Sequence, residues 1–315
     1  MPGQASKSSG AADLALKIAV LPCSRFRQPA PVLTLTDAEI RAAVRAALAE
    51  DVGPGDVTTL ACIPPDARTS ALMNAREPLV LAGLAFAETA FRELSPNVKL
   101  ERFAEDGAKL PAKSPALRVS GPTRAILTAE RVALNFVQRL SGVASLTAQF
   151  VDTIRGTKAK LLDTRKTTPG WRRFEKYAVA CGGGTNHRIG LFDLVLIKDN
   201  HLAALAHEQP NAISAAVARA RALYPALKVE VEADTLAQVA QAADAGADII
   251  LLDNMVPAQL REAVALIAGR AQTEASGGVQ LDTIRAIAET GVDFISAGAV
   301  THSARTMDLG LDFEP

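Results

Sequence analysis

The stretch VEVEADTLAQVAQAADAGADIILLDN, residues 229–254, contains a short apolar run, an amphipathic segment and a second apolar run. Val229–Val231 and Ile249–Leu252 have the length and composition of buried strands. Between them, Thr235–Ala245 has apolar residues at helical spacing and ends before Gly246, the residue type that favours a helix C-terminus. The order strand, helix, strand predicts a parallel βαβ unit.

The same alternation covers the whole chain beyond residue 160. The predicted strands are Lys160–Leu162, Leu194–Ile197, Val229–Val231, Ile249–Leu252, Gln272–Ala275 and Phe294–Ser296. The predicted helices are Ile213–Leu223, Thr235–Ala245, Pro257–Ile267 and Leu281–Glu289. Successive βαβ units indicate an α/β fold with a parallel sheet, either a barrel or a doubly wound sheet.

The chain before residue 160 mixes helices and strands. Thr36-Asp-Ala-Glu39 has capping-box spacing and predicts a helix start, and Gly and Pro in Asp51–Thr59 predict a loop. Short strands are expected around Ser70–Asn74, Val98–Phe103 and Leu117–Ser120. A helix is expected over Thr123–Leu140, with Ser141-Gly142 separating it from a second helix that runs to Ile154.

Composition excludes several classes of protein. The 315 residues carry 34 Lys and Arg against 34 Asp and Glu, so the surface as a whole is not built for nonspecific nucleic-acid binding. With 49% hydrophobic and 22% charged residues, the chain should fold as a globular protein. No apolar run reaches the length of a membrane span.

Two further features bear on location. Residues 1–33 are rich in Ala and Ser and are expected to form a flexible extension rather than a targeting peptide. Cys23, Cys62 and Cys181 are scattered thiols, as is typical of a reducing compartment, so a cytoplasmic protein is expected.

Polar or Gly-containing segments follow every predicted strand of the second half. They are Asp163-Thr164-Arg165-Lys166, Lys198-Asp199-Asn200-His201, Glu232, Asp253-Asn254, Ser276-Gly277-Gly278 and Ala297-Gly298-Ala299. In a parallel β/α barrel the C-terminal strand ends open onto one face, so these residues should converge on a single pocket. The alternative is that polar residues simply mark where strands stop.

Cations dominate this predicted pocket. Arg165, Lys166 and Lys198 would be joined by His187 and Arg188 from the loop GGGTNHR, residues 182–188. So many cations in a neutral protein imply an anionic ligand, because guanidinium groups pair with carboxylate or phosphate. The alternative is a solvated basic face, above all for three further residues, which are Arg172, Arg173 and Lys176. The two Gly-containing ends are candidates for a phosphate site formed by backbone N–H groups.

Glu232 and Asp253 are carboxylates at neighbouring strand ends beside the predicted phosphate site. They could hold Mg²⁺, which prefers carboxylate and phosphate oxygens, or stabilise a cationic centre. A salt bridge to Lys166 or Lys198 would be compatible with either role. The sequence shows no zinc-ligand spacing, no Ser–His–Asp order and no P-loop, so metal hydrolysis, triad chemistry and P-loop ATP hydrolysis are disfavoured.

A series of stretches in chain order resembles the quinolinate phosphoribosyltransferases, also called carboxylating nicotinate-nucleotide pyrophosphorylases. The stretches are EDVGPGDVTT (50–59), ERVALNF (130–136), LSGVAS (140–145), DTRKTTPG (163–170), GGTNHR (183–188), IKDNH (197–201), VEVE (229–232), LDN (252–254), EASGG (274–278) and GAVTHS (298–303). The first 33 residues lie outside the resemblance.

The resemblance implies an N-terminal α/β sandwich domain over residues 34–142 and an incomplete TIM-like β/α barrel over residues 143–301. Residues 302–315 would return toward the N-terminal domain. Family members convert quinolinate and phosphoribosyl pyrophosphate to nicotinate mononucleotide, pyrophosphate and CO₂ with Mg²⁺, in NAD biosynthesis. They are dimers or assemblies of dimers, and neither nucleic acid nor membrane is an expected partner.

The resemblance also implies roles for individual residues. The residues implied to surround the pyridine dicarboxylate are Arg131, Arg165, His187, Arg188 and Lys198, with Arg131 supplied by the partner subunit. Those implied to hold the phosphoribosyl donor and the metal are Lys166, Glu232, Asp253 and the two Gly-containing ends, with Lys166, Glu232 and Asp253 as the catalytic set. Thr164 is expected to bind substrate as well. Two alternatives stay open, a related transferase acting on another heterocyclic acid and a catalytically silent phosphate-binding protein.

Overall fold

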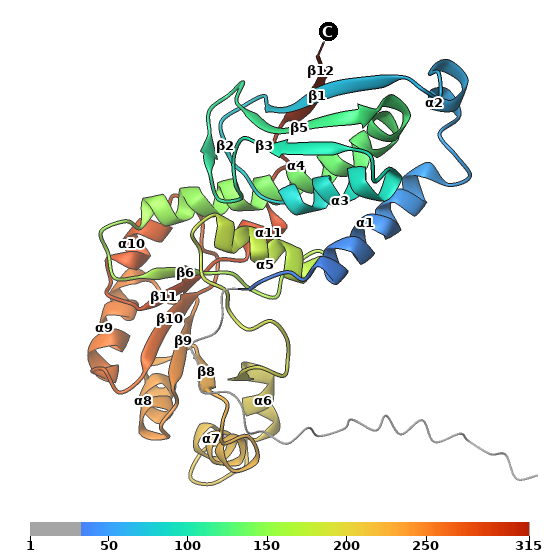
Figure 1. The fold of residues 1–315 in the computed structure, drawn as a ribbon. Coiled ribbons are helices and arrows are strands. Elements are labelled where there is room, and N and C mark those ends of the chain that lie inside the picture. Colours follow the sequence, from blue (N-terminus) through green and yellow to red (C-terminus); the bar gives the residue numbers. More distant parts are fainter. Residues whose placement is uncertain (1–32, 315) are drawn as a thin grey trace, which may run out of the picture.

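The computed structural model describes residues 33–314, which form two units joined by one long helix (Figure 1). The predicted extension, residues 1–33, lies outside the described residues except for Leu33. The elements of the first unit are α1 (Asp37–Val52), α2 (Val57–Cys62), β1 (Arg68–Ala75), β2 (Leu79–Val80), α3 (Leu84–Leu94), β3 (Lys99–Arg102), β4 (Lys109–Leu110), β5 (Pro115–Pro122) and the connecting helix α4 (Thr123–Thr153).

The first unit is an antiparallel sheet packed on helices. Its four strands have the order β12-β1-β5-β3, and β2 and β4 form a separate pair. Thr36 caps α1 through the predicted capping box with Glu39. The predicted loop at residues 51–59 is shorter than expected, because Asp56 accepts a hydrogen bond from Thr59 N–H and starts α2 inside it.

Helix α4 corrects the prediction of two helices separated at Ser141-Gly142. It is one helix of 31 residues, about 46 Å long. Gly142 does not break the helix. It allows the backbone of the C-terminal segment to pack closely against α4, since a Cβ at this position would lie 1.9 Å from the carbonyl oxygen of Arg305. The Ser141 hydroxyl accepts the N–H of Ala82 (3.0 Å). The pair therefore serves close packing, which helical periodicity does not reveal.

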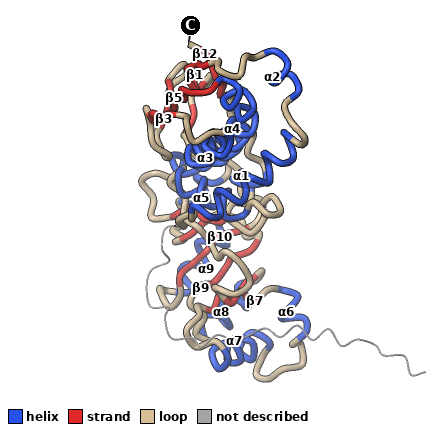
Figure 2. Tube along the Cα trace, turned by 45° about the vertical axis from the view of Figure 1, so that its right-hand side comes forward, coloured by secondary structure: helices blue, strands red, loops and turns tan. Residues whose placement is uncertain are grey.

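The second unit is a six-stranded parallel sheet with helices outside it (Figures 1 and 2). Its elements are β6 (Lys160–Leu162), α5 (Arg172–Cys181), β7 (Val195–Ile197), α6 (Asp199–Ala204), α7 (Ala212–Leu223), β8 (Val229–Ala233), α8 (Leu236–Asp244), β9 (Ile249–Asp253), α9 (Pro257–Ile267), β10 (Gln272–Ser276), α10 (Ile284–Ala288), β11 (Phe294–Ser296) and α11 (Ala299–His302). All six predicted strands are confirmed within a residue or two.

The strand order decides between the two architectures that the sequence left open. The order β6-β11-β10-β9-β8-β7 places β7 to β11 side by side in chain order and puts β6, the first strand, beside β11, the last. A doubly wound sheet would reverse this order at a switch point. The unit is an incomplete barrel whose opening lies between β6 and β7.

The chain ends in the first unit. Strand β12 (Leu309–Phe313) pairs antiparallel with β1, with Leu309 opposite Ala75. Between the units, Phe86 stacks on Phe136 (ring centroids 4.8 Å apart) and Phe136 stacks on Trp171 (4.9 Å). These rings belong to α3, α4 and the segment that enters α5, so they pack the first unit against the barrel.

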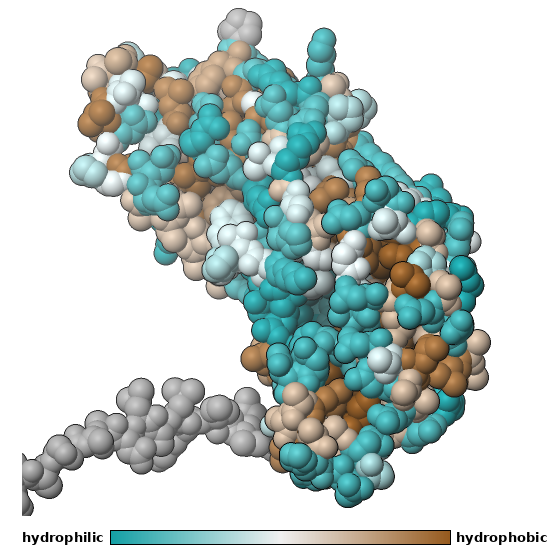
Figure 3. All heavy atoms as spheres, turned by 180° about the vertical axis from the view of Figure 1, so that it is seen from behind, coloured by the Kyte–Doolittle hydropathy of each residue, from teal (hydrophilic) through white to brown (hydrophobic). Residues whose placement is uncertain are grey.

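The surface seen from behind in Figure 3 is largely hydrophilic, with apolar side chains in separate patches rather than one continuous face. No helix in residues 33–314 combines the length and the apolar character that a membrane span requires.

Candidate active site

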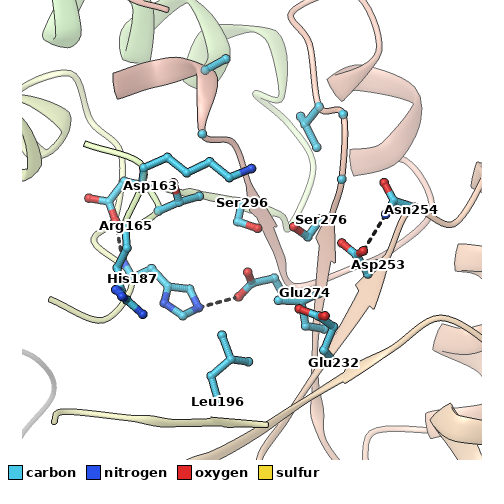
Figure 4. Close-up of a pocket in the computed structure, with 18 of the residues that line it drawn as sticks. Asp163, Arg165, His187, Leu196, Glu232, Asp253, Asn254, Glu274, Ser276 and Ser296 are labelled. Carbon is cyan, nitrogen blue, oxygen red and sulfur yellow. Dashed lines mark hydrogen bonds and ion pairs between the residues drawn. The ribbon is translucent and has the colours of Figure 1, made fainter. Parts of the chain in front are cut away.

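A pocket of about 610 Å³ opens at the C-terminal ends of the barrel strands (Figure 4). The candidate site residues that line it are Thr164, Arg165, Lys166, His187, Arg188, Lys198, Glu232, Asp253, Ser276, Gly277, Gly278, Gly298 and Ala299. They come from segments spread over more than a hundred positions of the chain. A parallel barrel gathers them because its C-terminal strand ends share one face.

One wall of the pocket is cationic. Arg165 follows β6 and Arg188 ends the loop that enters the pocket beside it. The Nε atom of Arg165 is buried and has no hydrogen-bond partner among the described residues. Burial and the nearby charge of Arg165 lower the pKa of Arg188. Two guanidinium groups this close, one with an unpaired donor, fit an anionic ligand with planar oxygens.

Lys198 and Lys166 lie differently. The Lys198 ammonium forms an ion pair with Glu232, the carboxylate at the end of β8. This is one of the salt bridges considered from the sequence. The Lys166 side chain is exposed and passes over Gly298, where an added Cβ would lie 3.0 Å from its Cδ. Glycine at position 298 therefore leaves room for Lys166 at the pocket rim.

The opposite wall combines carboxylates with free backbone donors. Burial, together with the charges of Glu232 and Asp234, raises the pKa of Asp253. A Cβ at Gly277, whose φ is +98°, would lie 2.1 Å from the side-chain oxygen of Asn254, so only glycine fits there. Within the described chain, the N–H groups of Gly277 and Gly278 meet no backbone acceptor. Free N–H groups beside acids that repel one another suit a phosphate accompanied by a cation.

Two buried acids lie beside the pocket. Glu274, 1% exposed, lines it, and Glu230, 0% exposed, is not among the lining residues. The Nε2 atom of His187 lies 3.1 Å from a carboxylate oxygen of Glu230 and 3.3 Å from one of Glu274. Figure 4 marks the contact with Glu274. Within residues 33–314, His187 is the only basic group within ion-pair distance of either carboxylate, and none of their four oxygens makes a hydrogen bond that meets standard geometry. Burial and the charge of Glu274 raise the pKa of Glu230.

The hydrogen bonds of His187 determine which nitrogen carries its proton. Nδ1 accepts the backbone N–H of Arg188 (2.7 Å), which keeps the ring proton on Nε2, facing the two acids. Burial lowers the pKa of His187 and the two neighbouring carboxylates raise it. A charged ring would carry a hydrogen on Nδ1 and would lose the contact with the Arg188 N–H, so this geometry is that of the neutral ring. The three groups lie within 4.8 Å of one another, as metal ligands could. A protonated Nε2 offers no lone pair, so the contacts favour a shared proton over a metal ion.

A buried ion pair stands behind this wall. Asp163, which follows β6, and Lys176 of α5 pair with both side chains 0% exposed. Burial raises the pKa of Asp163 and lowers that of Lys176, and each charge offsets part of the cost to the other. The alternative that Lys176 belongs to a solvated basic face is wrong. The single sequence does not distinguish it from Arg172 and Arg173, which are half-buried.

The residues that match known families cover both units. The family described as "Quinolinate phosphoribosyl transferase, N-terminal domain" matches residues 56–141, and its C-terminal counterpart matches residues 143–312. The chain belongs to the quinolinate phosphoribosyltransferase family.

Named relatives agree with this assignment. The chain is 44% identical over 287 residues to "Nicotinate-nucleotide pyrophosphorylase [carboxylating]" of Mycobacterium leprae, covering 88% of this chain and 99% of that protein. It is 42% identical over 292 residues to the protein of the same name, "chloroplastic", of Oryza sativa, covering 88% and 78%. The solved nicotinate-nucleotide pyrophosphorylase of Francisella tularensis superposes with a TM-score of 0.84 at 42% identity, covering 90% and 99%.

Two of the candidate residues of this quinolinate phosphoribosyltransferase lie outside its own pocket. Ala297, the first residue after β11, is 1% exposed and does not line the pocket, whereas Gly298 and Ala299 do. Arg131 is exposed on α4 and is absent from the lining of the pocket. In residues 33–314 it forms no ion pair, and Asp152, an acid on the same helix, pairs with Lys109 and Arg155.

The sequence interpretation missed the roles of Glu230, Glu274 and Asp163 in this quinolinate phosphoribosyltransferase. Asp163 was expected at the pocket as a strand-end residue, and it lines the pocket, but it was given no role. Neither glutamate was assigned to the site. A signal existed for the two glutamates, because a charged residue inside a short buried strand needs a partner in the interior. That partner, His187, is more than forty positions away from Glu230 and could be found only from the fold.

Proposed function

We propose that this chain transfers the phosphoribosyl group of phosphoribosyl pyrophosphate to quinolinate and releases CO₂, giving nicotinate mononucleotide and pyrophosphate. The observation that carries this assignment is a single pocket with two kinds of wall. Arg165, Arg188 and Lys198 line it as cations that suit a dicarboxylate, and the Gly277 and Gly298 ends offer backbone donors that suit phosphates. This places an acid and a phosphorylated sugar within reach of each other.

The transfer step needs charge stabilisation rather than an enzyme nucleophile. The bond from ribose C1 to pyrophosphate breaks with its electron pair on the leaving group, and the ring nitrogen of quinolinate bonds to C1. Lys166 at the rim would stabilise the growing negative charge on pyrophosphate. Glu232 and Asp253 would stabilise the positive charge that develops on the ribose. Fixed side chains at strand ends hold both substrates before reaction, which lowers the entropic cost of bringing them together.

Decarboxylation follows from the product of the first step. Once ribosylated, the ring nitrogen is cationic and can hold the electron pair left on the adjacent carbon when CO₂ departs. That carbon then takes up a proton. The cations of Arg165 and Arg188 orient the carboxylates for this step, and the pocket needs no further catalyst for it.

Mg²⁺ fits the same wall. Burial first, and then the charge of Glu232, raise the pKa of Asp253, and a bound cation would favour the charged form of both carboxylates. Carboxylates next to phosphate oxygens are the ligands that Mg²⁺ prefers. Bound there, Mg²⁺ would neutralise charge on pyrophosphate; its use as cofactor is part of the proposal.

A direct assay tests the function. The purified chain is mixed with quinolinate, phosphoribosyl pyrophosphate and Mg²⁺, and CO₂, pyrophosphate and mononucleotide are measured together. We expect the three products in equal amounts and no reaction when either substrate is left out. Absence of mononucleotide with a correctly folded chain would reject the assignment.

We also propose that the site is shared between two subunits of a homodimer. Arg131 is exposed on α4, forms no ion pair in residues 33–314 and does not line the pocket of its own chain. Arg131 lies in a stretch typical of the family, and no acid in residues 33–314 pairs with it. Its side chain would therefore be free to enter the pocket of a neighbouring subunit.

The dimer is tested by mixing two inactive variants, Arg131→Ala and Lys166→Ala, under conditions that let subunits exchange. With a shared site, one of the two pockets in each heterodimer keeps both residues. Random mixing of equal amounts should therefore restore about a quarter of the wild-type activity, since half of the dimers would be mixed. No recovery, with exchange verified by differently tagged subunits, would place Arg131 outside the shared site.

We propose a cytoplasmic location, which the free thiols of Cys62 and Cys181 support. Cell fractionation with an antibody to the chain tests this, and enrichment in a membrane or organelle fraction would contradict it.

A further inference from the structure

The opening of the barrel is bridged by a loop rather than by a strand. Strands β6 and β7 are the two edges of the sheet, and they are not paired with each other. The segment that carries His187 lies against β6 through one bridge, Leu162 opposite Thr185. The N–H of Thr185 donates to the carbonyl of Leu161 (2.8 Å), and its carbonyl accepts the N–H of Asp163 (3.2 Å). Beyond Thr185 no strand pairing holds the loop among the described residues.

Beyond this bridge, the buried ion pair between Asp163 and Lys176 holds the loop through hydrogen bonds. Asp163 accepts the backbone N–H of His187 (2.8 Å), and the Lys176 ammonium donates to the carbonyl of His187 (3.0 Å). The two charges thus hold both polar groups of the His187 backbone. The side-chain amide of Asn186 donates to the second carboxylate oxygen of Asp163 (2.7 Å) and to the carbonyl of Lys176 (2.8 Å).

This arrangement sets the positions of two candidate binding residues. With its backbone fixed, His187 presents Nδ1 to the N–H of Arg188 and Nε2 to Glu230 and Glu274. Arg188 is therefore oriented by the same contacts. On the other side, Thr164, Arg165 and Lys166 follow Asp163 directly in the chain. The ion pair between Asp163 and Lys176 therefore links the segment after β6, which carries Arg165 and Lys166, with the loop that carries His187 and Arg188.

Stability alone does not account for such a pair. Removing two charges from water costs about as much as their attraction returns, and apolar pairs of similar size are often equally stable. A misplacement of about 1 Å in a site, by contrast, can cost about 100-fold in rate. We propose that Asp163 and Lys176 are positioning residues that hold His187 and Arg188 in the quinolinate pocket across the open side of the barrel. This inference rests on the proposed function.

The experiment separates positioning from folding by comparing single and double variants. Lys176→Met and Asp163→Asn each leave a buried group without its partner, so both should lower the melting temperature. The double variant, Asp163→Asn with Lys176→Met, removes both charges and should recover most of the wild-type melting temperature. We expect its KM for quinolinate to stay at least about tenfold above wild type, because the loop is still misplaced. KM for phosphoribosyl pyrophosphate should change less than about threefold.

A matched control removes an ion pair that lies far from the pocket. Glu88, 8% exposed, pairs with Arg102 in the first unit. Glu88→Gln should lower the melting temperature without changing either KM. A second control adds His187→Ala to the double variant. If the ion pair acts through His187, the combined rise in KM for quinolinate should be clearly smaller than the product of the separate rises.

The outcomes are distinct. A double variant with recovered stability and a wild-type KM for quinolinate would overturn the inference and leave the ion pair a purely structural element. Fully multiplicative effects with His187→Ala would also overturn it. If the wild-type chain itself does not turn over quinolinate, the proposed function fails instead, which the wild-type arm of every assay reveals.

Discussion

Strand β1 of the first unit and strand β8 of the barrel place their charges in opposite ways. Burial alternates along most of β1, and the ion pair beside it, Arg76 with Asp312, is 45% and 43% exposed. Strand β8 is buried throughout, although it contains Glu230 and Glu232. An antiparallel sheet can keep one face in water, whereas a parallel strand in a barrel is covered on both sides.

This difference separates what each region contributes. Exposed pairs such as Arg76 with Asp312 are worth little, so the first unit depends on its apolar core. In the barrel, each buried charge needs a partner or a ligand, since an unpaired one would be costly. We therefore expect changes of charge in the barrel to act on the reaction and changes in the first unit to act on stability. Four predictions test this, in order of expected effect.

The largest effect is expected for Lys166→Ala, which should lower kcat by at least about 100-fold because it removes a charge aimed at the leaving group. The fold should survive, since the side chain is exposed at the rim. Lys160→Ala is the matched control, as Lys160 is exposed at the opposite end of the same strand and should leave kcat unchanged. Steady-state kinetics and circular dichroism measure both. A loss of less than about tenfold would make Lys166 an ordinary surface lysine.

A pair of identical substitutions compares the two regions directly. Val119 of β5 and Val231 of β8 are both 0% exposed. Replacing either by Ala should reduce the free energy of unfolding by about 1.5–3 kcal/mol. Only Val231→Ala should also raise the KM values, because its strand carries Glu230 and Glu232 to the pocket. Both variants are assayed at a temperature at which they are fully folded. If they change the KM values equally, the expectation that only the barrel acts on the reaction is wrong.

Substrate selection should be the next largest effect. Nicotinate has one carboxylate, so it would leave part of the cationic wall unpaired, and its kcat/KM should be at least about tenfold below that of quinolinate. No CO₂ should form from it. Competition between the two acids, with both mononucleotides quantified, measures the ratio. Efficient use of nicotinate would contradict the dicarboxylate pocket and favour a related transferase.

The smallest effect concerns an ion pair in the first unit. Hydrogen bonds from Arg305 and from Asp308 N–H lower the pKa of Glu77 from 4.5 to about 2. Because the folded state favours the charged form, this contribution is present above pH 4.5 and is lost as pH falls toward 2. It should amount to less than about 1 kcal/mol, since such pairs are partly solvated. Glu77→Gln should lose that amount at neutral pH and show a flatter stability curve below pH 4.5 in urea titrations. An unchanged acid slope would argue against a role of Glu77.

Much of the fold was readable from local patterns. The strands β6 to β11 and the helices α1, α7, α8 and α9 begin and end near their predicted positions, because apolar spacing and capping residues act over short distances. The single helix α4 was misread, since the reason for Gly142 lies at Arg305, far along the chain. Short edge strands such as β2 and β4 carry too few residues for any periodicity.

The site was partly readable for a related reason. Residues at strand ends, among them Lys166, Glu232 and Asp253, were found because a parallel barrel gathers its strand ends on one face. Glu230 and Glu274 were not found, because their role depends on which way a buried side chain points. Lys176 was placed among surface residues, although a buried partner, Asp163, holds it in the interior.

The sequence by itself determined the alternation of strands and helices, the chemistry at the strand ends and the family to which the chain belongs, since these depend on local spacing and on residue type. The fold was needed to show that the sheet closes as an incomplete barrel, that His187 faces two buried acids and that Asp163 and Lys176 pair in the interior. The physical reason is that hydrogen bonds and ion pairs between distant segments depend on distances in space. Those distances are set by packing of the whole chain, and no local pattern records them.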